Sequence, residues 1–130
     1  MIPPADVSNV WHLVEPGLLT LIKRCPDRFS PRDVYWFLKE NKATLILINE
    51  GEGFMVLEMG QEPFKGHRIL TVWLLYYLQA KKHKAQLLER IKQIGRQVNC
   101  THLQFKSPRK GWFKEADGFK PILTTWEMEL

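Results

Sequence analysis

A concentration of positive charge is the most distinctive chemical feature of this sequence. Between positions 81 and 96, one acidic residue, Glu89, stands among basic side chains, namely Lys81, Lys82, Lys84, Arg90, Lys92 and Arg96. A second basic cluster consists of Lys106, Arg109, Lys110 and Lys114. Such clusters favour anionic partners: nucleic acid, a phosphate-bearing cofactor or an acidic surface. A solvated helix face produces the same pattern, so charge alone leaves the partner open.

The histidines and cysteines point away from metal or nucleophilic chemistry. The histidines are His12, His67, His83 and His102, and none stands at metal-ligand spacing from another histidine, a cysteine or an acid. No Ser-His-Asp or Cys-His arrangement is apparent. The two cysteines, Cys25 and Cys100, lie far apart at the ends of apolar helical patterns. We therefore expect no metal site, and two free, packed thiols in a reducing compartment.

Length and composition are those of one globular domain. The chain has 130 residues, of which 45% are hydrophobic, so we expect a single domain over 1–130 with its own core. Its longest apolar stretches, 45–48 and 72–78, fall far short of the roughly 20 residues that cross a bilayer. The first residues carry neither the charged start nor the apolar run of a signal peptide. We expect a cytoplasmic protein without membrane contact.

The apolar periodicity alternates between helical and extended segments. Ser30 and Pro31 mark one helix start as N-cap and first helical residue. Leu87, Leu88 and Ile91 lie on the apolar face of the clearest amphipathic helix. The predicted helices span 16–25, 31–41, 83–98 and 109–116, with Pro16 in the first turn of the first helix. The predicted strands span 10–14, 44–48, 54–59, 69–78, 101–106 and 122–129.

The order of these segments predicts the sheet. Strands 44–48 and 54–59 form an antiparallel hairpin around a turn at 51–53. The helix 83–98 connects strands 69–78 and 101–106 as a βαβ unit, whose strands must be parallel. We therefore predict an α/β (α+β) fold with a mixed, mostly antiparallel sheet flanked by helices.

This order resembles that of the GNAT-type N-acetyltransferases. Residues 94–105 look like the family's third helix running into its fifth strand, and 111–121 resemble its last helix and the turn that follows. The phrases Trp-His-Leu-Val-Glu-Pro at 11–16 and Arg-Lys-Gly-Trp at 109–112 are similar to those of short GNAT-like proteins of tailed bacteriophages. The resemblance covers roughly residues 10–130 and implies the GNAT fold.

The resemblance also implies a site for acetyl-CoA where strand 69–78 parts from strand 101–106. The backbone of one strand would pair with the pantetheine arm as an added strand does, and the following loop and helix start would hold the pyrophosphate. The implied cofactor-binding residues are Val72, Trp73 and Leu74 on the strand, then Gln79, Lys81, Lys82, His83 and Lys84.

The same loop departs from the family's pattern. Active relatives carry the phrase Q/R-x-x-G-x-G/A, whereas here Gln79 is followed by Lys82 and Lys84 at the glycine positions. Either the lysines contact phosphate as point charges, or the loop has lost the cofactor and serves another purpose. Many members of the family also use a tyrosine on the last helix as general acid. The matching stretch of this sequence has Trp112 and Phe113 instead. Tyr76 and Tyr77, near the end of strand 69–78, could substitute for it, but we expect them to pack or to lie at the rim of the site.

Acetyl transfer to an amine needs a base, which in this family is often a strand glutamate. Glu58, an isolated acid in an apolar strand, is the matching carboxylate; a solvated strand face is its other interpretation. The first hypothesis is thus an acetyl-CoA-dependent N-acetyltransferase acting on an amine or protein substrate. The alternative is a non-catalytic protein on the same scaffold, with a phage or host protein partner. Nucleic-acid binding ranks third, because no nucleic-acid motif accompanies the charge.

Overall fold

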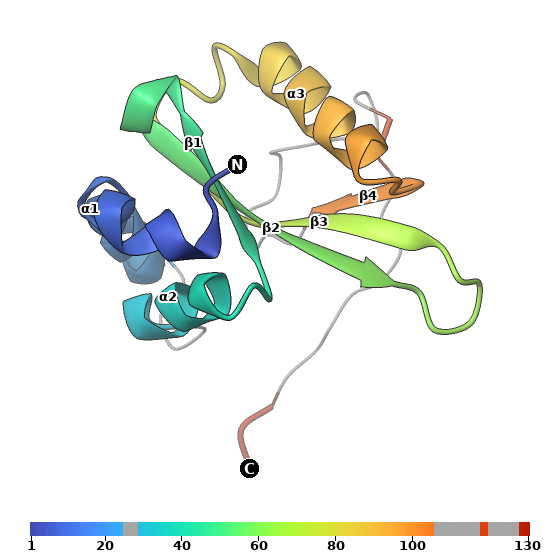
Figure 1. The fold of residues 1–130 in the computed structure, drawn as a ribbon, viewed down its shortest axis with the longest axis horizontal. Coiled ribbons are helices and arrows are strands. Elements are labelled where there is room, and N and C mark those ends of the chain that lie inside the picture. The colour runs from blue at the N-terminus through green and yellow to red at the C-terminus, as the bar shows by residue number, and fades with distance from the viewer. Residues whose placement is uncertain (25–28, 106–117, 120–127) are drawn as a thin grey trace.

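The computed structural model describes residues 1–24, 29–105, 118–119 and 128–130, and it has helices on both faces of a central sheet (Figure 1). The elements are η1 (Pro4–Asp6), α1 (Val7–Arg24), α2 (Pro31–Lys39), β1 (Thr44–Ile48), η2 (Asn49–Gly51), β2 (Gly53–Gln61), β3 (Arg68–Tyr77), α3 (Lys84–Gln97) and β4 (His102–Phe105). The helix predicted at 109–116, nearly all of the strand predicted at 122–129, and Cys25 lie outside these residues.

The sheet has the mixed topology that the sequence predicts. Its strands lie in the order β1-β2-β3-β4. Strand β2 is antiparallel to both β1 and β3, whereas β3 and β4 are parallel and connected through α3. The bounds of β1 match the prediction, and those of β2, β3, β4 and α3 differ by a few residues at most. Figure 1 shows α1 and α2 on one face of the sheet and α3 on the other.

The prediction for the N-terminal segment is wrong. No strand forms at 10–14, and the first helix does not begin near Pro16; α1 starts at Val7 and contains Pro16 in its interior. Val7, Val14 and Leu18 lie on one helical face and are buried. This apolar spacing continues across the proline, and burial of the face outweighs the cost of a proline inside a helix.

The start of α2 confirms the predicted N-cap. The N–H of Asp33 donates to Ser30 Oγ at 3.2 Å, and the N–H of Ser30 donates to the Asp33 carboxylate at 2.9 Å. This capping box satisfies two backbone donors at once. The helix ends at Lys39, before the predicted end, and Asn41 has a left-handed φ of 60°. The capping therefore fixes where α2 begins on the sheet.

Two apolar layers cover the two faces of the sheet. The first layer joins α1 and α2 to the sheet through Val7, Val14, Leu18, Val34, Leu38, Ala43, Leu45, Phe54, Val56 and Leu74. The second joins α3 to the sheet through Ile46, Met55, Leu57, Leu70, Val72, Leu75, Ile91 and Ile94. As predicted, β1 is covered on both faces, because Leu45 belongs to the first layer and Ile46 to the second.

Gly17 lets α1 approach the sheet closely. A Cβ atom built at this position would lie 2.9 Å from Phe54 Cε1 and would overlap the ring of Tyr76. Those two rings stack on each other, with centroids 5.9 Å apart. The ring of Phe54 cannot retreat easily, because Phe54 is fully buried. The absence of a side chain at Gly17 therefore sets the spacing between α1 and the ends of β2 and β3.

Replacing this glycine tests the contact. Although alanine favours a helix by about 1 kcal/mol over glycine, we expect Gly17→Ala to lower the free energy of unfolding by about 1–2 kcal/mol, because overpacking costs more. Urea denaturation measures the change. Gly60→Ala is the matched control, since nothing lies within 4 Å of a Cβ there. Equal stability of the Gly17→Ala protein and the parent would show that α1 can shift freely.

Candidate functional site

Strand β3 contains a β-bulge at Trp73. Along β2, the consecutive residues Val56 and Leu57 pair with Leu74 and Val72, so that Trp73 is an extra residue on β3. Trp73 and Leu74 consequently both face the layer of α1 and α2, whereas Val72 faces α3. A bulge bends its strand and redirects side chains, and bulges are frequent beside active sites.

The described part of β4, His102–Phe105, pairs with β3 only as far as Val72. The last partners in the parallel register are Val72 and Phe105, whereas β3 continues to Tyr77. Within the part of the chain that the structure describes, residues 73–77 have no strand partner on this edge. An unpaired strand edge can accept an extended ligand through backbone hydrogen bonds. In the described part of the chain, the pairing with β4 therefore ends at Val72, directly before the bulge at Trp73 and Leu74.

The turn after β3 leads directly into α3. The N–H of Ala80 donates to the Tyr77 carbonyl at 3.1 Å, and the N–H of His83 donates to the Gln79 carbonyl at 3.1 Å. Ala80 is buried against Tyr77 and Leu87, which anchors the turn. The side chains of Gln79, Lys81 and Lys82 are exposed, and those of His83 and Lys84 are half-buried. The structure therefore gathers these five predicted residues at one helix start.

The start of α3 is electrostatically suited to an anion. No side chain caps its backbone, and its first turn contains no acidic residue. The first-turn N–H groups have no intrahelical acceptor, and the helix dipole places positive potential there. The ring of His83 stacks on Tyr77 and its Nδ1 lies 3.0 Å from Gln86 Oε1, so it is held beside the turn. Lys81 and Lys82 add mobile positive charge.

The missing glycines do not strain this turn. Positive φ angles occur at Asn41, Asn49, Glu50 and Asn99 and at three glycines, but at no residue from 78 to 84. The backbone conformation of the turn is therefore one that lysine adopts readily. A glycine here would serve only to let a ligand approach the backbone closely.

Glu58 lies on the same face of the sheet as Trp73. It pairs across β2 and β3 with the buried Thr71, and strand alternation places it on the side of Val56, which packs in the first layer. Glu58 is half-buried, and its carboxylate makes no hydrogen bond or ion pair with any described residue. The ring of Trp73 contacts Phe29 and Phe37, with centroids 5.9 and 5.5 Å away. A carboxylate and an aromatic cluster thus share this face.

The remaining predicted positions have structural roles or cannot be placed. Tyr76 stacks on Phe54, and buried Tyr77 accepts a hydrogen bond from Asn49 Nδ2 at 2.7 Å, so both tyrosines pack as expected. Trp112, Phe113 and the second basic cluster lie outside the described residues. Within the described ranges, no three potential ligands gather as a metal site, and no helix is long and apolar enough to cross a membrane.

The sequence singles out Val72, Trp73 and Leu74 as candidate cofactor-binding residues, but it does not predict the bulge at Trp73. The stretch around Trp73 contains no glycine or proline that would have indicated an irregular strand. Trp73 and Leu74 are adjacent apolar residues, and this pair is the one sequence signal of a bulge. The strand is apolar on both faces, so that the pair does not interrupt any alternation of polar and apolar residues. The aromatic contacts of Phe29 and Phe37 with Trp73 likewise join segments that sequence spacing does not relate.

Comparisons with known proteins place this geometry in a wider context. No protein-family model and no curated protein matches the sequence. Among solved structures, a ribosomal-protein-alanine N-acetyltransferase from Brucella melitensis biovar Abortus 2308 matches 99% of this chain and 95% of its own, at a TM-score of 0.71 and 15% identity. A putative acetyltransferase from Arthrobacter sp. FB24 matches 97% and 92%, at a TM-score of 0.66 and 16% identity.

A GNAT family acetyltransferase from Staphylococcus aureus is also similar, covering 78% of each chain at a TM-score of 0.57 and 15% identity. These identities are too low to transfer a substrate, yet the first two superpositions extend over nearly the whole of each chain. The element order, the mixed sheet and the superpositions agree, and the chain has the fold of the GNAT acetyltransferases.

Proposed function

We propose that this protein is an acetyl-CoA-dependent N-acetyltransferase. One observation carries the proposal: within residues 72–84, a bulge, a strand end without a described partner on the β4 side and an uncapped basic helix start follow one another. The first feature shapes the strand, the second offers backbone groups, and the third attracts phosphate. The structural neighbours named above are acetyltransferases, which supports the same activity.

The residues present fit the two ends of acetyl-CoA. The backbone of Val72, Trp73 and Leu74 would hold the extended pantetheine arm, and the first-turn N–H groups of α3 would bind the pyrophosphate. Lys81 and Lys82, both exposed, would neutralise its charge, with Gln79, His83 and Lys84 around it. When bound, acetyl-CoA supplies the acetyl group as a thioester.

Glu58 would act as the base for the acceptor amine. An amine is mostly protonated at neutral pH and must lose a proton before it can attack. The Glu58 carboxylate has no internal partner in the described chain, so that it is available to take up this proton. It lies on the face where Phe29, Phe37 and Trp73 form an aromatic cluster, which would exclude water from one side of the amine. The acceptor is an amine of a small molecule or of a protein.

A non-catalytic role on the same scaffold is the second candidate. Lys82 and Lys84 stand at the glycine positions of the family phrase, and Trp112 and Phe113 stand where a tyrosine acts in active relatives. In that case the basic turn would contact an acidic surface of a phage or host protein. A nucleic acid is a third partner that the exposed lysines would attract. Binding of acetyl-CoA separates the first candidate from the others.

The lysines provide the first test of the cofactor site. An exposed ion pair contributes roughly 0.3–1 kcal/mol. We therefore expect Lys81→Gln with Lys82→Gln to weaken acetyl-CoA binding about 3- to 30-fold and to reduce its salt dependence. Isothermal titration at several salt concentrations measures both effects. Lys65→Gln, in the β2–β3 loop, is the control. The absence of any heat with the parent protein at millimolar acetyl-CoA would refute the enzymatic proposal.

Restoring the family glycines distinguishes a weakened site from a reassigned one. In Lys82→Gly with Lys84→Gly, the loss of two charges opposes binding, whereas closer approach of the backbone to phosphate favours it. We expect acetyl-CoA affinity to rise, because backbone N–H groups that reach the phosphate directly contribute more than exposed lysines, whose attraction is screened by water and salt. The same titration reports the result. Unchanged binding of acetyl-CoA together with lost binding to nucleic acid or protein would assign the turn to the other partner.

Removal of the Glu58 charge tests the base. General-base catalysis contributes roughly a hundredfold to ten-thousandfold. We expect Glu58→Gln to lower kcat/KM by about this factor, measured as release of free coenzyme A with an amine acceptor panel, while the affinity for acetyl-CoA stays the same. Glu62→Gln, on the loop that follows the same strand, should retain full activity. A Glu58→Gln protein of parental activity would eliminate this residue as the base.

A further inference from the structure

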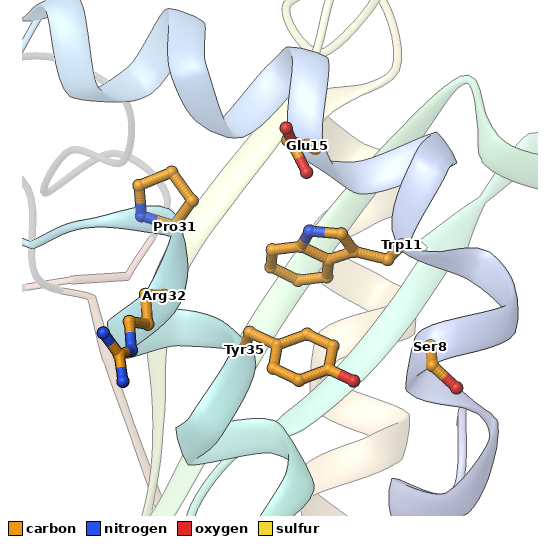
Figure 2. Close-up of a pocket in the computed structure, with 6 residues that line it drawn as sticks. All are labelled: Ser8, Trp11, Glu15, Pro31, Arg32 and Tyr35. Carbon is orange, nitrogen blue, oxygen red and sulfur yellow. The ribbon is translucent and has the colours of Figure 1, made fainter.

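A pocket lies between α1 and α2, formed by residues other than those of the proposed acetyl-CoA site (Figure 2). It is a shallow, open groove with a volume of about 480 Å³, so a bound ligand would stay partly exposed to solvent. Ser8, Trp11 and Glu15 line it from one face of α1, and Pro31, Arg32 and Tyr35 line it from the start of α2. The capping box of α2 holds the second wall in place.

The floor of the pocket is aromatic and firmly supported. The rings of Trp11 and Tyr35 meet edge to face, with centroids 5.1 Å apart and planes at 79°. Both residues are half-buried and pack against the core layer beneath α1 and α2. Neither the indole N–H nor the phenol hydroxyl makes a hydrogen bond with a described residue. A rigid apolar surface with unused polar ends is typical of a ligand site.

Two opposite charges line the same pocket without neutralising each other. Figure 2 shows Glu15 beside the indole of Trp11 on the α1 side, and Arg32 on the α2 side with its guanidinium pointing away from the rings. Both side chains are exposed, and neither forms an ion pair with the other or with any other described residue. The pocket therefore offers the Glu15 carboxylate, which attracts a cation, and the Arg32 guanidinium, which can turn toward an anion.

We propose that this pocket binds a small zwitterion of the amino-acid type with an apolar side chain. Its ammonium group would lie between the Glu15 carboxylate and the aromatic faces, where a cation is attracted by both. Its carboxylate would be bound by the guanidinium of Arg32, and its side chain would cover Trp11 and Tyr35. A ligand with a single charge satisfies one wall and is repelled by the other, so that the zwitterion is the better complement.

L-phenylalanine is a suitable probe, and the indole N–H signal of Trp11 in ¹⁵N–¹H spectra is the readout, assigned by its loss in Trp11→Phe. We expect a saturable shift of this signal. Glu15→Gln and Arg32→Gln should each weaken binding about fivefold, because each removes one exposed ion pair. Glu52→Gln and Arg90→Gln, exposed charges away from the pocket, should leave binding unchanged, and the spectra themselves show that every variant stays folded.

Two analogues show which end of the probe meets which wall. L-phenylalaninamide lacks the carboxylate, so Glu15→Gln should weaken its binding, whereas Arg32→Gln should not weaken it and should relieve a repulsion. N-acetyl-L-phenylalanine lacks the ammonium group and should show the opposite pattern. Equal affinity of all three compounds, or affinity unaffected by either charge substitution, would reduce the pocket to a merely apolar surface and overturn the proposal. So would the absence of any saturable Trp11 shift with L-phenylalanine.

Discussion

The β-bulge at Trp73 reverses which side chains of β3 face α3. Before the bulge, Leu70 and Val72 face α3; after it, Leu75 faces α3, while Leu74 and Tyr76 face the other layer. In a regular strand every second residue shares a face, so that Leu74 and Tyr76 would have joined Val72 on the α3 side. One inserted residue therefore decides which core layer the second half of the central strand belongs to.

Both helical layers depend on this change of face. Tyr76, turned toward α1, receives the close approach of Gly17 and stacks on Phe54. Tyr77, turned the other way, packs with Ala80 and Leu87 and so sets the turn into α3. Two consecutive residues, Tyr76 and Tyr77, thus make the contacts that position α1 on one face of the sheet and the start of α3 on the other. The proposed cofactor site occupies the segment between the bulge and this turn.

Sequence patterns predict the elements of this fold better than their irregularities. The antiparallel hairpin, the parallel βαβ unit and the cap at Ser30 follow from local signals, and each is confirmed. The prediction of a helix start at Pro16 is wrong, because it rests on the preference of proline for the first helical turn. The apolar spacing of Val7, Val14 and Leu18 continues across Pro16. The bulge at Trp73 left no local trace, because it arises from pairing with β2 and from packing on both faces. Glu58 could be singled out as an acid in an apolar strand, but its nearness to Trp73 required the register.

The basic turn shows why an absent glycine has two separate meanings. Where glycine is needed for a positive φ, another residue strains the backbone; where it is needed for close approach, another residue only keeps the ligand farther away. The φ angles of residues 78–84 exclude the first meaning here. The second meaning remains: a phosphate bound at this turn would lie farther from the backbone N–H groups, within reach of the long lysine side chains. Backbone N–H donors are fixed in place and partly shielded from solvent. The attraction between an exposed lysine and an anion acts through water and becomes weaker as the salt concentration rises. A turn of this kind would therefore bind an anion with less geometric selectivity and more dependence on ionic strength than a glycine-rich one.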